Sequence, residues 1–84
     1  MAVVRKIELV MSLPDGHQVE CQISELEASL FGRKGWQVVE IELGEGRSRR
    51  PARHTYMPVS REQADDYYDR LIFERIARGF VTKA

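Results

Sequence analysis

The sequence predicts an α+β fold: an antiparallel β-sheet of three to five strands with one long C-terminal helix packed across it. Apolar and polar residues alternate over residues 3–13, 19–23 and 36–43, as they do in strands with one buried face. Over residues 61–78 the apolar spacing changes to that of a helix. A sheet followed by one helix buries its apolar face against that helix, so we expect a single domain spanning residues 1–84.

The composition is that of a small soluble protein. Eighty-four residues provide enough apolar surface for one core, and 43% of them are hydrophobic and 31% charged. No apolar run approaches the roughly 20 residues that span a bilayer, and the N-terminus lacks the pattern of a cleaved secretory signal. The single cysteine, Cys21, excludes an intramolecular disulfide and fits a reducing compartment. We therefore expect a cytoplasmic protein that does not associate with membranes.

The first part of the chain predicts a β-hairpin. Residues 3–13 and 19–23 alternate in polarity on either side of Pro14-Asp15-Gly16, a turn in which proline presets φ and glycine tolerates positive φ. Arg5 interrupts this pattern, because it stands on the apolar side of its strand.

A further strand is predicted over residues 36–43, where Val39 and Ile41 alternate with Glu40 and Glu42. We expect the aliphatic side of this strand to face the core, because period-2 alternation usually separates a buried face from a solvated one.

The helix has clear boundary signals. Ser60 and Gln63 form a capping box, Gly79 is placed to end the helix, and Phe80 can fold back onto the last turn. The expected buried stripe consists of Ala64, Tyr67, Tyr68, Leu71 and Ile72. We expect four side chains to be almost inaccessible in the core: Val39, Ile41, Leu71 and Ile72.

Two glycines and a proline predict a loop over residues 44–51, with a short strand after it over residues 52–57. Four arginines gather here: Arg47, Arg49, Arg50 and Arg53. Guanidinium groups bind phosphates bidentately, so this cluster is a candidate contact for the backbone of DNA or RNA. The alternative is a solvated loop neutralised by Glu40, Glu42 and Glu45, in line with a formal net charge of zero.

Arg75 and Phe73 are two further candidates on the predicted helix. Arg75 falls in the middle of the apolar stripe, where its head either escapes to water at the helix end or is held by the core and aimed at an anion. Phe73 points away from the stripe, so it is either a single exposed aromatic residue or a contact for a protein partner.

Several motifs, taken in order, resemble the WGR domain, a small module of poly(ADP-ribose) polymerases and of short stand-alone bacterial proteins. The matching residues are Leu30-Phe31-Gly32, Trp36, Gly44, Arg47, Arg49, Arg75 and Gly79-Phe80. The resemblance covers roughly residues 20–81 and implies a bacterial binding module linked to nucleic acids. Leu43 and Glu45 stand where the family has the tryptophan and arginine of its naming motif, and an acidic residue at that point disfavours a phosphate contact there.

Residues 24–32 permit two interpretations. Ser24 followed by Glu27, with Gly32 at the end, is the local signature of a short helix. The WGR resemblance instead implies the end of a strand and a loop, with Leu26 and Ala28 on one side of the strand. We adopt the strand and loop.

The sequence offers no recognised catalytic arrangement. His17, His54 and Cys21 lack partners at the spacing of known nucleophile or metal motifs, and no glycine-rich phosphate loop is present. We therefore expect no enzymatic activity, no metal and no cofactor. Two functions remain: a module that contacts nucleic-acid phosphates through the arginine-rich loop and Arg75, or a protein–protein interaction domain that has lost the nucleic-acid site.

Overall fold

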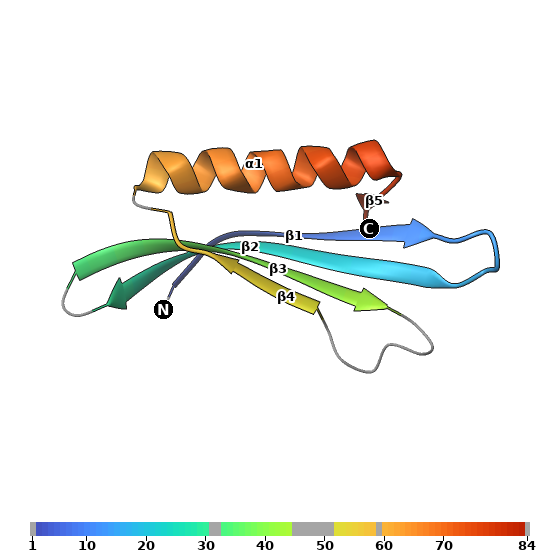
Figure 1. The fold of residues 1–84 in the computed structure, drawn as a ribbon, viewed down its shortest axis with the longest axis horizontal. Helices are drawn as coiled ribbons and strands as arrows, with labels where there is room; N and C mark the ends of the chain where they lie inside the picture. Colours follow the sequence, from blue (N-terminus) through green and yellow to red (C-terminus); the bar gives the residue numbers. More distant parts are fainter. Residues whose placement is uncertain (1, 31–32, 45–51, 59, 84) are drawn as a thin grey trace.

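The computed structural model describes residues 2–30, 33–44, 52–58 and 60–83. Its elements are β1 (Ala2–Ser12), β2 (Gln18–Leu30), β3 (Arg33–Gly44), β4 (Ala52–Tyr56), α1 (Arg61–Arg78) and β5 (Val81–Thr82). The strands form one antiparallel sheet in the order β4-β3-β2-β1-β5, and α1 lies across one face of it (Figure 1). The predicted α+β fold is thereby confirmed.

The β1–β2 hairpin is confirmed together with its turn. The Leu13 N–H donates to the His17 carbonyl at 2.7 Å, and the Gly16 N–H donates to the Leu13 carbonyl at 3.0 Å. Gly16 has a φ of 91°, a conformation that side chains disfavour. The Asp15 carboxylate accepts the His17 backbone N–H at 3.0 Å and closes the turn from outside.

The interpretation of residues 24–32 as a strand holds for the part that is described. β2 pairs with β3 without interruption from Val19 opposite Gly44 to Leu30 opposite Arg33. Residues 31–32, where the loop was predicted, lie outside the described residues. A central strand has two hydrogen-bonded neighbours, here β1 and β3, and these two ladders outweigh the local helix signals.

Both ends of α1 follow the predicted signals. The Ser60 side chain accepts the Gln63 backbone N–H at 3.2 Å. At the other end Gly79 is left-handed, with a φ of 112°, and the Phe80 N–H donates to the Arg75 carbonyl at 3.1 Å. Phe80 is buried against the last turn. Among the described residues no helix is long and apolar enough to cross a membrane.

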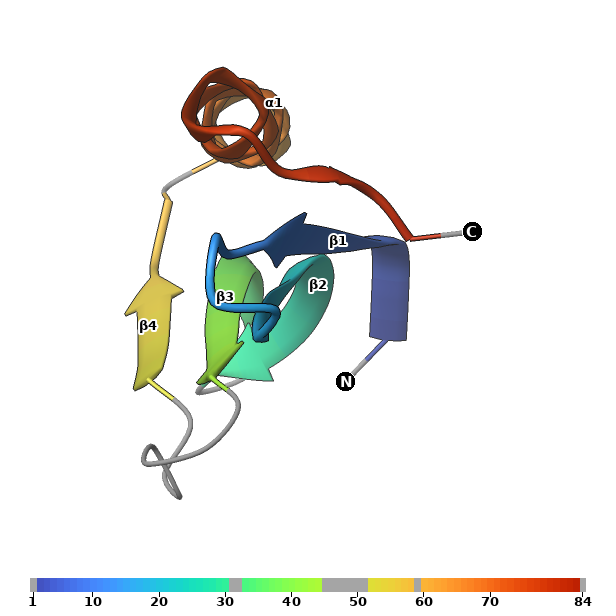
Figure 2. The same cartoon turned by 90° about the vertical axis from the view of Figure 1, so that its right-hand side faces the viewer.

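The core lies between α1 and one face of the sheet. Its buried residues are Leu9, Cys21, Ile23, Val38, Ala64, Tyr68, Leu71 and Phe80. Figure 2, which looks along the helix, shows α1 above the sheet, with β4 on one side and the C-terminal segment crossing to the other. β4 and β5 are therefore the two edge strands.

On β3, Val39 is almost inaccessible as predicted, but the prediction was wrong about which face of the strand meets the helix. Directly opposed residues of antiparallel strands share a face, and Ile23 stands opposite Glu40. Ile23 packs in the helix-facing core, so Glu40 faces the helix and Val39 faces away. Val39 is buried on that other face, but Ile41 is only half-buried.

On the helix, Leu71 is buried as predicted, whereas Ile72 is half-buried and Tyr67 is 38% exposed. These two predictions were wrong, because the centre of the buried stripe falls on Tyr68, Leu71 and Arg75. The flanking residues of a helix that crosses a sheet lie at the margins of the contact and keep part of their surface in water.

Candidate functional site

Arg75 is buried between α1 and β3. Only 6% of its surface is exposed, and its Nε donates to Glu40 Oε2 at 3.3 Å while Nη2 donates to Glu42 Oε2 at 3.2 Å. Its guanidinium also lies 5.2 Å from the centre of the Phe80 ring. Burial alone would lower the pKa of Arg75, but the hydrogen bond to Glu40 and the two carboxylate charges outweigh it and raise that pKa.

The anion that Arg75 holds is therefore internal. Neither interpretation of the sequence anticipated an internal ion pair. The Arg75 guanidinium neither reaches water nor faces an anion outside the protein. The Arg75 side chain is buried and its charge is offset by two carboxylates, so this position does not favour Arg75 as a nucleic-acid contact. The pairing also explains why the glutamate side of β3 faces the helix.

A second charged cluster lies at the opposite end of α1 and resolves the anomaly of Arg5. Arg5 pairs with Glu25 at 2.8 Å, with Asp65 at 3.3 Å and with Asp69 at 3.5 Å. Its guanidinium also lies 4.2 Å from the centre of the Tyr68 ring. Arg5 thus stands on the apolar side of β1 because it connects the sheet to the first half of the helix.

Glu25 is the residue of this cluster whose negative charge is least well compensated. Its side chain is fully buried, and its Oε2 has no hydrogen-bond partner in the part of the chain that the structure describes. Burial and the neighbouring Asp65 carboxyl raise the pKa of Glu25, and the nearby Arg5 only partly offsets them. The ionised form of Glu25 is therefore less favourable in the folded protein than in the unfolded chain.

We expect Glu25→Gln to become more stabilising, relative to the natural protein, as pH rises. The folded state holds the Glu25 proton above the ordinary pKa of 4.5, so the natural protein loses stability as pH rises from there through the raised pKa. Each tenfold difference in proton affinity is worth about 1.4 kcal/mol. Urea denaturation of both proteins across the acidic to neutral range measures the difference, with exposed Glu74→Gln as the control for loss of a surface carboxylate. A difference between Glu25→Gln and the natural protein that is constant with pH contradicts the raised pKa.

Of the predicted phosphate contacts, Arg53 lies on the edge strand β4. Its side chain is exposed, stands opposite Ile41, and makes no ion pair with any described residue. By the alternation of the strand it projects from the face opposite the helix. Arg47, Arg49 and Arg50 lie outside the described residues.

Phe73, the predicted partner contact, is 73% exposed on the outer side of α1. Ile76 lies one turn further along, a neighbouring position on the helix surface, and is 52% exposed. The structure thus places two apolar side chains side by side at the C-terminal half of the helix, as sequence analysis indicated for only one of them.

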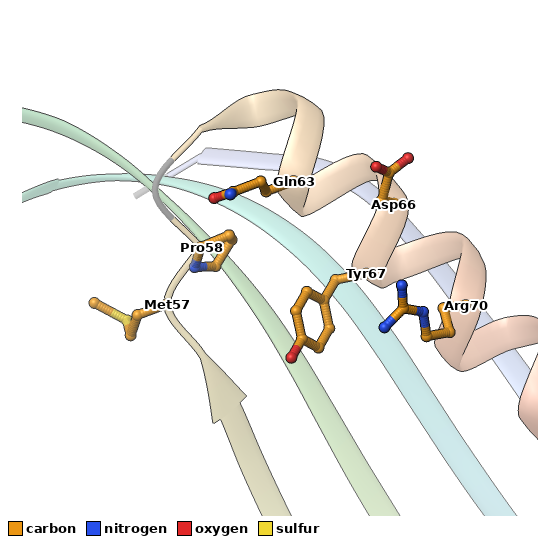
Figure 3. A pocket seen from close by; sticks show the side chains of 6 residues that line it. All are labelled: Met57, Pro58, Gln63, Asp66, Tyr67 and Arg70. Carbon is orange, nitrogen blue, oxygen red and sulfur yellow. The ribbon is translucent and has the colours of Figure 1, made fainter.

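A pocket that sequence analysis did not anticipate lies beside the first turns of α1 (Figure 3). Its volume is about 300 Å³, and it is lined by Met57, Pro58, Gln63, Asp66, Tyr67 and Arg70. The Tyr67 ring lies 5.0 Å from that of Tyr56, tilted by 31°, and the Arg70 guanidinium is 5.7 Å from the Tyr67 ring centre. The pocket is lined by residues that follow β4 and by residues of α1, so no local sequence motif predicts it.

Cys21 lies in the core and His17 in the hairpin turn. Burial raises the pKa of the Cys21 thiol to about 11, which leaves it protonated and unreactive at neutral pH. The exposed His17 ring contacts Asp15 at 2.9 Å within the hairpin turn. Within the described ranges, no group of three or more histidine, cysteine or acidic side chains is placed to hold a metal ion.

Comparison with known proteins gives no relative: no family model matches the chain, and no curated protein or solved structure matches it. The resemblance to WGR domains therefore remains a prediction from the motifs.

Proposed function

We propose that this chain is a small, non-catalytic module of the bacterial cytoplasm that binds the nucleic-acid backbone through the basic segment 47–53. The observation that carries the proposal is the engagement of Glu40 and Glu42 by Arg75. These two glutamates were the main candidates to neutralise the basic segment from within the sheet. Arg75 offsets one of these two negative charges, so the arginines keep more of their charge for an external anion.

The position of Arg53 supports the same proposal. It is exposed near the start of β4, directly after the segment that carries the other three arginines. An edge strand presents its side chains and one side of its backbone to a ligand without rearrangement of the sheet. Contacts of this kind are made to phosphates and carry little sequence information.

We expect binding to fall steeply with salt, with a log–log slope of about −0.9 for each duplex phosphate contacted and no steeper than about −4 for four arginines. Arg49→Ala with Arg50→Ala should flatten the slope by about 2 units, to a similar extent for all sequences. Fluorescence anisotropy with labelled duplex and single strands measures both. The matched control is Lys6→Ala with Arg78→Ala, which removes two exposed cations elsewhere. An unchanged slope in the Arg49/Arg50 variant, or no binding at micromolar concentrations, would refute the proposal.

A second candidate function is a protein–protein interaction domain. It is favoured by the exposure of Phe73 and Ile76 on adjacent turns of α1, because large apolar side chains exposed together often mark contact surfaces. For this function, a purified partner should lose at least about 2 kcal/mol of binding free energy with Phe73→Ala and almost none with Arg49→Ala. The reverse pattern would exclude the helix surface.

A further inference from the structure

We propose that the pocket between β4 and α1 is a nucleobase site that prefers bases carrying an exocyclic amino group, so that the ligand is single-stranded nucleic acid. The inference rests on the proposed function and deepens it, since it adds a base contact to the phosphate contacts. It concerns only residues 57–58 and 63–70, all described by the structure.

The walls of the pocket suit a flat, apolar ring. Tyr67 is 38% exposed and Met57 is 56% exposed, and Pro58 lies between them beside the helix (Figure 3). Aromatic side chains stack on every base, because each base has a π-face. At about 300 Å³ the pocket is at the small end of the range for small-molecule sites, which fits one base and not a larger ligand.

The rim of the pocket supplies an acceptor and a donor. Asp66 and Arg70 are four residues apart on α1, the spacing of a helical ion pair, yet no ion pair forms between them. Arg70 instead lies over Tyr67, and no described residue pairs with the Asp66 carboxylate. Both groups therefore remain able to bond a ligand edge.

The carboxylate decides which kind of ligand fits. Asp66 repels a phosphate but accepts a hydrogen bond from the exocyclic amino group of cytosine, adenine or guanine. Thymine and uracil present a carbonyl at the corresponding position, which repels the carboxylate, and offer Asp66 only the ring N3–H as a donor. We therefore expect cytosine or adenine to be preferred over thymine or uracil.

The pocket lies just beyond the end of β4, the strand that carries Arg53. Met57 follows Arg53 by four residues, which is about 13 Å along extended chain. Because Arg53 projects from the face opposite the helix, a short single strand can contact it at the edge of β4 and turn one base around that edge into the pocket. In a duplex the bases are paired and stacked, so this contact requires an unpaired base.

The first test compares Tyr67→Ala with Phe73→Ala, which removes an exposed aromatic residue from the same helix outside the pocket. We expect Tyr67→Ala to weaken binding of a short cytosine or adenine oligonucleotide by about 5-fold or more, the lower end for one base–aromatic stack. Its salt slope should stay unchanged, since no phosphate contact is lost. Phe73→Ala and Tyr67→Phe, which keeps the ring, should bind like the natural protein. Equal affinity of Tyr67→Ala and the natural protein, or an equal loss in Phe73→Ala, would overturn the base site while leaving the phosphate proposal standing.

The second test removes the phosphate altogether. Neutral cytidine, titrated in an NMR experiment, should shift the backbone amide signals of Met57, Tyr67 and Arg70, and thymidine should shift them less. Asp66→Ala should abolish this preference. Shifts with cytidine but no salt-dependent oligonucleotide binding would retain the base site and refute the phosphate proposal. The absence of shifts with either nucleoside would overturn the base site, as would a preference for thymidine.

Discussion

Replacing Arg75 with methionine is expected to lower the free energy of unfolding by about 3–5 kcal/mol. Methionine keeps most of the stem that packs beneath the helix but removes the charge. Glu40, whose side chain is 8% exposed, is then left buried without its cationic partner. A buried charge without a partner costs several kcal/mol, whereas Glu42 is 42% exposed and can turn to water.

Thermal and urea denaturation measure this effect, which corresponds to a fall in Tm of at least about 12 °C for a domain of this size. Arg78→Met is the matched control, because Arg78 is exposed on the same helix and should change stability by less than about 0.5 kcal/mol. The double variant Arg75→Met with Glu40→Leu removes both buried charges and should recover most of the lost stability. Equal stability of Arg75→Met and Arg78→Met would show that the buried ion pair is not formed.

The elements that sequence analysis predicted correctly are those set by local chemistry. The helix from Arg61 to Arg78 begins at a capping serine and ends at a left-handed glycine, and both signals act within a few residues. The hairpin turn at Gly16 is equally local. Each of these features depends on the conformation that its own residues favour, so it can be inferred without knowledge of distant contacts.

The buried face of β3 could not be inferred in that way. The alternation of Val39 and Ile41 with two glutamates indicates which residues share a side, but not which side meets the helix. That choice depends on Arg75, which is 35 positions from Glu40 in sequence and provides the charge that makes burial of a glutamate tolerable. The anomalous position of Arg75 was visible in the sequence, and pairing it with the glutamates would have identified the correct face.

The candidate sites also divide into those that depend on local sequence and those that depend on long-range contacts. Exposure of Phe73 and of Arg53 could be predicted, because each is set by position on one helix or one strand. The pocket beside Tyr67 could not, because Met57 and Pro58 come close to the helix only once β4 has paired with β3. Long-range assembly, and not residue type, creates that site.

The two charged clusters have a common consequence for the architecture. Arg5 joins β1 and β2 to the first half of α1, and Arg75 joins β3 to its last turn. Charged pairs constrain partners and distances more narrowly than apolar contacts do. We infer that these two clusters set the position of the helix along the sheet, while the apolar residues between them supply most of the favourable free energy of packing.

The contribution of the apolar residues to stability is tested by Leu71→Ala. We expect this variant to lose about 2–5 kcal/mol in the free energy of unfolding. Leu71 is 7% exposed at the centre of the helix-facing core, next to the turn of Tyr68. Its truncation removes apolar contact and leaves a cavity that the surrounding strands cannot fill completely. A chain of 84 residues has a total stability of roughly 4–13 kcal/mol, so the variant approaches the limit at which it folds.

Urea denaturation measures the loss directly, and a fall in Tm of at least about 8 °C should accompany it. Ile76→Ala is the control, because it removes a similar aliphatic side chain from the same helix at a position that is 52% exposed. We expect the control to change stability by less than about 0.5 kcal/mol, since its side chain is largely solvated in the folded state. If the two variants lost equal stability, the helix would have to be turned on the sheet so that Ile76 and not Leu71 faced the core, and the pairing of Arg75 with Glu40 would fail with it.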